Sequence, residues 1–176
     1  MSRLLAGLAV AVVVITACST GRPQGKSAVA FTKLDTIRGA VSLVGNDPAA
    51  ELILSLDPDS VPIALAGSRV APLRHLRKLD VMVAGRFTGQ RSLTASPRGA
   101  RVFEADTFVV RGMDGTPAVD GIITMQNSRF FLLANGRRLP VEYMPKALQG
   151  KLGARVFLAG PLEAPLIFYG VILEKP

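Results

Sequence analysis

The sequence contains one cysteine, one histidine and no tryptophan among its 176 residues, and these shortages exclude several classes of protein. A single cysteine rules out a disulfide framework and a cysteine-built zinc site. A single histidine, His75, rules out a histidine-cluster metal site and disfavours Ser-His-Asp chemistry. Charged residues make up only 19% of the chain and hydrophobic residues 49%, so a packed core is expected and wholesale disorder is not.

Motifs of common catalytic machinery are also missing from the chain. The sequence has no glycine-rich phosphate loop, no Gly-x-Ser-x-Gly and no His-Glu-x-x-His. The neighbours of His75 are basic, which disfavours its charged form, and no carboxylate nearby in the sequence would orient the ring. We therefore expect a protein that is not an enzyme, with no cofactor and no metal.

The one hydrophobic run suited to a membrane lies near the N-terminus. Arg3 precedes twelve apolar residues, 4–15, and Ile15-Thr16-Ala17-Cys18 closes this region. The run is shorter than the roughly 20 residues needed to span a bilayer. A single positive charge followed by a short apolar stretch is typical of a secretory signal peptide.

The residues around Cys18 resemble the lipobox of bacterial lipoproteins, because a small residue precedes the cysteine and an aliphatic one stands three before it. This resemblance implies that residues 1–17 are a cleaved lipoprotein signal peptide and that Cys18 carries acyl chains such as palmitate, which anchor the protein to a membrane. It further implies a Gram-negative-type cell envelope, and Ser19 favours the outer membrane, facing the periplasm. The alternative is an uncleaved anchor with an incidental thiol. The polar residues 18–34 are expected to form a tether.

From residue 35 onward the pattern is typical of β-strands. Short apolar runs with β-branched residues are separated by glycine, proline, aspartate and asparagine. The best helical candidates are short and cover residues 72–79 and 145–152. We therefore predict an all-β fold with short helices.

The two halves of this region resemble each other. Each runs strand, strand, strand, short helix, strand, strand, with Gly39 or Gly121 in the first strand. This order resembles the OB-fold, a five-stranded Greek-key barrel, and implies two small OB-like Greek-key barrels in tandem, residues 35–112 and 117–176. The alternative is a β-sandwich. Each glycine is expected where a side chain would obstruct the coiling of the strand, and halves this small are expected to pack together.

The excess of positive charge is concentrated in one segment. The formal net charge is +8, and within residues 69–101 the only acid is Asp80. We expect residues 86–101 to be the loop between strands 4 and 5 of the first half, beside the face that OB-folds use for ligands. Guanidinium groups bind phosphate and carboxylate in a bidentate manner. The candidate anion-binding residues are Arg86, Arg91, Arg98 and Arg101. The alternative is a solubilising loop with no specific partner.

The expected partners are a membrane, through the N-terminal lipid, and a protein of an envelope complex. Residues 161–173 are almost wholly apolar, so both faces of that strand should be covered, by the first half or by another protein. A non-catalytic binding or scaffold module, or an accessory subunit of a membrane complex, is the leading expectation. The alternative is a binder of anionic lipid, lipopolysaccharide, glycan or another small anion through the arginine segment.

Nucleic acid is not an expected partner. Stacking platforms need exposed aromatic residues on strands 2 and 3. In the first half those strands contain none, and in the second half only one of the neighbours Phe130 and Phe131 can face outward if the strand alternates.

Overall fold

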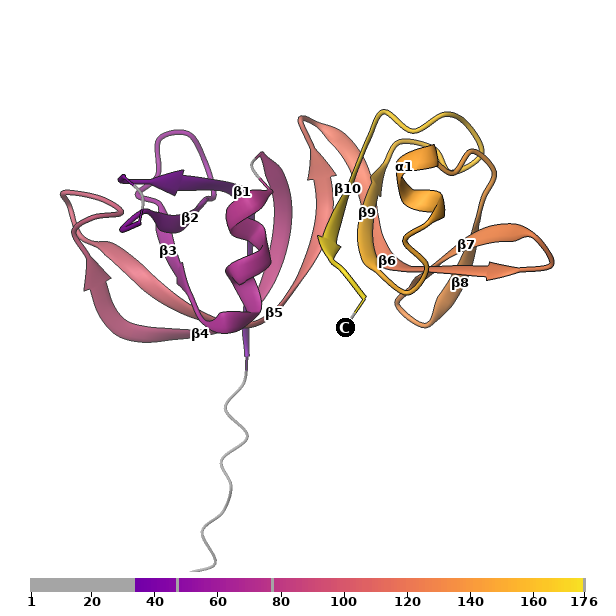
Figure 1. The fold of residues 1–176 in the computed structure, drawn as a ribbon. Helices are drawn as coiled ribbons and strands as arrows, with labels where there is room; N and C mark the ends of the chain where they lie inside the picture. The colour runs from indigo at the N-terminus through magenta and orange to yellow at the C-terminus, as the bar shows by residue number, and fades with distance from the viewer. Residues whose placement is uncertain (1–33, 47, 77, 176) are drawn as a thin grey trace, which may run out of the picture. The chain divides into compact units, whose positions relative to one another are not determined.

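The computed structural model describes residues 34–46, 48–76 and 78–175, and these residues form an all-β fold with two short helices (Figure 1). The predicted fold class is thus confirmed. The expectations for the signal peptide 1–17, for Cys18 and for the tether up to residue 33 lie outside the described residues. Within the described residues, no helix is long and apolar enough to cross a membrane.

The first half contains five strands that close into a ring. They are β1 (Asp35–Val44), β2 (Glu51–Ser55), β3 (Ile63–Ala66), β4 (Leu79–Ser92) and β5 (Ala100–Met113). β1 pairs antiparallel with both β2 and β4, β2 pairs with β3, and β4 pairs with β5. A parallel pairing between β3 and β5 closes the ring. This order of strands agrees with the OB-like arrangement expected for the first half.

A 3₁₀ helix, η1 (Ser68–His75), connects β3 to β4. The sequence placed this helix at residues 72–79, so it begins and ends about four residues earlier than expected. A 3₁₀ helix has three residues per turn. Val70 and Leu73, spaced three apart, are therefore on one side of the helix and are both buried in the core of the ring. The second helix, α1 (Lys146–Gln149), lies within the expected residues 145–152.

The second half repeats the pairings of the first but does not close. Its strands are β6 (Thr116–Gln126), β7 (Arg129–Ala134), β8 (Arg137–Val141), β9 (Arg155–Ala159) and β10 (Phe168–Leu173). β6 pairs with β7 and β9, β7 with β8, and β9 with β10, all antiparallel. No pairing joins β8 to β10 within the described residues. Instead, the Glu142 N–H donates to the Leu162 carbonyl at 3.0 Å, so the β9–β10 loop bridges the opening.

The equivalent glycines of the two halves explain why each first strand can curve. A Cβ placed on Gly39 in β1 would collide with the Ser55 carbonyl of β2. A Cβ placed on Gly121 in β6 would lie 2.5 Å from the Leu133 carbonyl of β7. Both glycines therefore permit a close approach of neighbouring backbones, as the sequence pattern predicted.

The two halves are joined by a short turn and contribute to one common cluster, in addition to the second half's own core. β5 and β6 are joined by the turn Asp114-Gly115, which has positive φ at both residues, and Met113 pairs with Thr116 across it. Phe108 of β5 belongs to the same buried cluster as Phe157 of β9. The two halves thus pack against each other, as expected from their small size.

Candidate functional site

The arginine segment is a hairpin and not the long loop that the sequence suggested. Arg86 and Arg91 lie in β4, Arg101 lies in β5, and only Arg98 belongs to the connecting loop, residues 93–99. The expectation of a loop over 86–101 was therefore wrong. Gly89 has a φ of +79° within an irregularity of the β4–β5 ladder between Phe87 and Arg91, and the strand continues beyond it.

The loop 93–99 also lies differently from the expectation. Ala95 of this loop is buried in a small cluster with Ile53 of β2 and Ala64 of β3. The loop thus covers part of the outer face of β2 and β3. It was expected to lie beside the face that OB-folds use for ligands. A ligand that binds where Ala95 covers Ile53 and Ala64 would have to displace the loop.

Three of the four predicted arginines line a common pocket. Arg91, Arg98 and Arg101 surround a cavity of about 140 Å³, whose remaining walls are formed by residues 61–63 and Gly99. Arg91 and Arg101 stand directly opposite each other across the β4–β5 ladder. Arg98 reaches the same cavity from the loop.

Arg86 lies outside this pocket and has a partner of its own. Its Nη2 is 2.9 Å from Oε2 of Glu104 on the neighbouring strand. The hydrogen bond and the negative charge of Glu104 raise the pKa of Arg86, with a smaller contribution from Asp106. This arginine is therefore already neutralised within the chain.

The pocket arginines have no such counter-ion. Within the described residues, no carboxylate lies within 4 Å of Arg91, Arg98 or Arg101. The Arg91 Nη1 donates to the Gly99 carbonyl at 2.9 Å, and the guanidinium carbon of Arg101 lies 3.5 Å from the centre of the Phe87 ring. Like charges placed directly opposite each other on paired strands destabilise the sheet.

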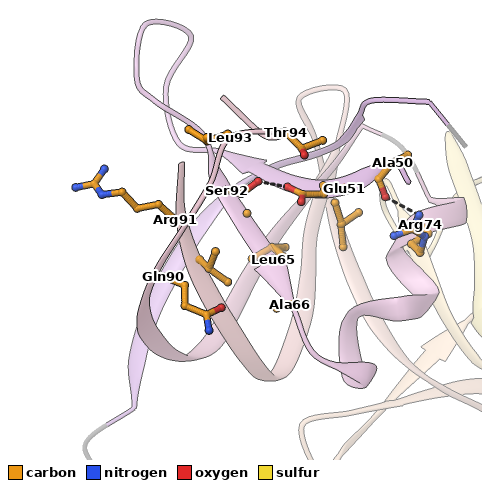
Figure 2. Close-up of a pocket in the computed structure, with 13 residues that line it drawn as sticks. Ala50, Glu51, Leu65, Ala66, Arg74, Gln90, Arg91, Ser92, Leu93 and Thr94 are labelled. Carbon is orange, nitrogen blue, oxygen red and sulfur yellow. Dashed lines mark hydrogen bonds between the residues drawn. The ribbon is translucent and has the colours of Figure 1, made fainter. Parts of the chain in front are cut away.

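A larger hollow of about 580 Å³ is lined by Arg91 together with other residues of β2, β3 and β4, and Figure 2 shows its lining. Two charged groups of its lining, Glu51 and Arg74, already have partners within the chain. The Ser92 hydroxyl donates to the Glu51 carboxylate, and Arg74 donates to the Ala50 carbonyl at 2.7 Å. Figure 2 also shows that Arg91 points away from Glu51. The smaller arginine pocket is therefore the better candidate for binding a charged ligand.

A second candidate surface crosses the sheet of the second half. Five residues, here called the outer row, stand opposite one another on five neighbouring strands. In order across the sheet they are Leu173, Arg155, Ile122, Leu133 and Arg138. The three apolar side chains are 46%, 42% and 39% exposed, respectively. The sequence did not reveal this row, because strand register brings together residues that are far apart in the chain.

The apolar segment 161–173 packs against two clusters, and part of it stays exposed. Leu162, Leu166 and Val171 pack against the core of the second half. Phe168 and Ile172 of β10 pack into the core cluster that contains the first half. Tyr169 and Leu173 are 44% and 46% exposed. One face of β10 is thus covered by the cluster that contains the first half, and the other is covered in part by the second half's own core at Val171, while Tyr169 and Leu173 stay exposed.

Of the two neighbouring aromatic residues in β7, Phe130 and Phe131, it is Phe131 that faces outward. Phe130 packs against the core of the second half, whereas the guanidinium of Arg138 lies 5.6 Å from the centre of the Phe131 ring. One aromatic residue thus accompanies the outer row.

An ion pair beneath the outer row connects the two halves. The Asp120 carboxylate in β6 accepts from the Val110 N–H at 2.9 Å and from Nη2 of Arg155 at 2.6 Å. The same Nη2 donates to the Phe108 carbonyl at 2.7 Å. Asp120 is the one polar or charged residue found buried among the described residues, and nothing in the sequence marked it.

The part of the chain that the structure describes contains no group of three or more histidine, cysteine, aspartate or glutamate side chains arranged to hold a metal. In comparisons with known proteins, no protein-family model, no curated protein and no solved structure matches this chain.

Proposed function

We propose that this chain is a non-catalytic, lipid-anchored protein of the bacterial cell envelope that acts as a scaffold or accessory subunit of a membrane complex. In this proposal, Cys18 carries the lipid, and the protein lies at the outer membrane and faces the periplasm. The outer row of the second half then docks onto a protein partner. The exposed apolar row is the observation that carries this proposal.

The outer row indicates an interaction site because its exposed apolar side chains include direct neighbours. Single exposed apolar side chains are normal on protein surfaces, whereas contiguous ones indicate an interaction site. Ile122 and Leu133 stand directly opposite each other on paired strands, which brings their Cβ atoms to about 4.5–5.5 Å. The row also continues the sheet face that already packs against the first half through Phe157.

The charges in the row suggest the chemistry of the partner. Arg155 is neutralised by Asp120, but Arg138 has no carboxylate within 4 Å among the described residues. Arg137, its neighbour in β8, is also exposed. A complementary partner therefore presents an apolar centre with acidic side chains at the edge that faces β8.

To test this proposal, the tagged full-length lipoprotein is recovered from its own membranes in mild detergent and washed at low and at high salt. Mass spectrometry then identifies the proteins that are retained. Contact through apolar side chains resists salt, whereas purely ionic contact does not. We expect a defined set of proteins to survive the high-salt wash.

Matched variants assign this set to the outer row. Ile122→Ser combined with Leu133→Ser should lose the retained proteins. Leu56→Ser combined with Leu93→Ser alters exposed apolar residues of the first half and should keep them. The proposal fails if both double variants retain the same proteins, or if only lipid or polyanion is recovered and is lost at high salt.

A further inference from the structure

We infer that the pocket formed by Arg91, Arg98 and Arg101 is a binding site for a phosphate group that belongs to a phosphate ester. The site lies in the first half and is independent of the outer row and of the protein partner proposed above. Two sources share this chemistry, the headgroup of an anionic phospholipid and a soluble organic phosphate.

The three pocket arginines repel one another, and no carboxylate of the described residues offsets this electrostatic cost. Arg91 and Arg101 are directly opposite each other on paired strands, and Arg98 adds a third positive charge at the same cavity. No carboxylate among the described residues lies within 4 Å of these three side chains. A bound anion would turn the repulsion between the opposed arginines into attraction toward a shared ligand.

Other exposed arginines of the same sheet show the contrasting arrangement. Arg38 in β1 donates three hydrogen bonds to Asp80 in β4, and Arg86 in β4 donates two to Glu104 in β5. At two positions of this ring the neighbouring strand therefore supplies a carboxylate, directly opposite Arg86 and diagonal to Arg38. At the Arg91–Arg101 position it supplies a second arginine.

Two of the three guanidinium groups are held in place. The Arg91 Nη1 is held by the Gly99 carbonyl, which leaves its Nε and Nη2 groups as donors. The Phe87 ring lies against the face of the Arg101 guanidinium and holds the plane of this group in place. The N–H groups lie in that plane and can still donate to a ligand. Positioned planar donors of this kind match the oxygens of a phosphate, which accepts hydrogen bonds from several directions.

The remaining walls favour an ester over a free inorganic ion. Residues 61–63, Val-Pro-Ile, form the apolar side of the cavity. A volume of about 140 Å³ is small, given that one water occupies about 30 Å³ in the liquid. The cavity thus admits a phosphate and its first carbon atoms, and the rest of the ligand lies outside it.

The test uses the full-length lipoprotein in micelles of a neutral detergent, with binding measured by calorimetry and by the rise in unfolding temperature. Three probes are used: inorganic phosphate, glycerol 3-phosphate, and micelles doped with phosphatidylglycerol. We expect glycerol 3-phosphate or phosphatidylglycerol to bind more tightly than inorganic phosphate. Binding of phosphatidylglycerol alone assigns the site to a lipid headgroup, and binding of glycerol 3-phosphate as well assigns it to phosphate esters in general.

Charge-matched variants separate a site from general attraction between charges. The triple variant R91Q/R98Q/R101Q should bind the ester probe at least about tenfold more weakly. The control R69Q/R111Q/R129Q removes the same charge from exposed arginines outside the pocket and should change the affinity less than about twofold.

A single variant separates weaker binding from a loss of folded structure. The Arg98 side chain makes no hydrogen bond or ion pair among the described residues, so Arg98→Gln should leave the unfolding temperature without ligand unchanged and still weaken binding. The inference is overturned if none of the three probes binds, if both triple variants weaken binding equally, or if inorganic phosphate binds as tightly as the esters.

Discussion

Removal of the Asp120 carboxylate is expected to destabilise the protein strongly and to loosen the contact between its two halves. The Asp120 side chain is 8% exposed and that of its partner Arg155 is 25% exposed. Asp120→Ala leaves the Val110 N–H without its acceptor and Arg155 without its counter-ion. Breaking a buried ion pair by removing one partner costs about 3–5 kcal/mol.

Two features place the expected loss at the lower end of that range. Arg155 is partly exposed, so water compensates part of the lost charge interaction, and its Nη2 keeps the hydrogen bond to the Phe108 carbonyl. We therefore expect a loss of about 3 kcal/mol in the free energy of unfolding. For a chain of this size, such a loss lowers the unfolding temperature by roughly 6–12 °C.

The assay is thermal unfolding followed by circular dichroism, with Asp80→Ala as the matched control. Asp80 also pairs with an arginine across neighbouring strands, but the side chains of Arg38 and Asp80 are 63% and 33% exposed. Exposed pairs contribute little, so the control should shift the unfolding temperature far less. Asp120→Asn, which keeps an acceptor for the Val110 N–H, should fall between the two. Equal shifts for Asp120→Ala and Asp80→Ala would refute the reasoning.

Two further predictions concern backbone packing and anchoring. Gly121→Ala should lower the free energy of unfolding by about 1–3 kcal/mol in urea titrations, because the added Cβ meets the Leu133 carbonyl, whereas Gly150→Ala, which meets nothing within 4 Å, should have little effect. An equal loss for both glycines would contradict this account. Cys18→Ser should abolish acylation and move the protein from the membrane to the soluble fraction, as measured by palmitate labelling and fractionation, and continued membrane association with incorporated label would contradict the lipobox interpretation.

The sequence was sufficient to predict strands and their order, because these depend on local features. Short β-branched runs between glycine, proline and aspartate predicted all ten strands observed, and the similarity of the halves predicted that their pairings would repeat. The glycines in the two first strands also carried a local signal, since a strand interior tolerates glycine mainly where another backbone approaches closely.

Strand ends and helix limits were predicted less well. Residues 86–101 were expected to form a loop, yet the β4–β5 ladder passes Gly89 through an irregularity and resumes at Arg91 and Arg101. A glycine with positive φ suits both a loop and a bulge, and the partner strand decides which of the two forms. The helix expected at residues 72–79 also differs from the prediction. It covers Ser68–His75 and follows a 3₁₀ period.

The sequence by itself determined that this protein is an all-β chain of two similar halves with an arginine-rich segment, since composition and periodicity are properties of neighbouring residues. Only the tertiary structure decided which arginines lie together. The cross-strand register places Arg91 opposite Arg101, and it places Arg86 opposite Glu104, with which it forms an ion pair. It alone revealed the outer row and the buried Asp120, whose partners Val110 and Arg155 come from different strands. Contacts of this kind depend on how strands pair across the sheet, and no local pattern of residues encodes that pairing.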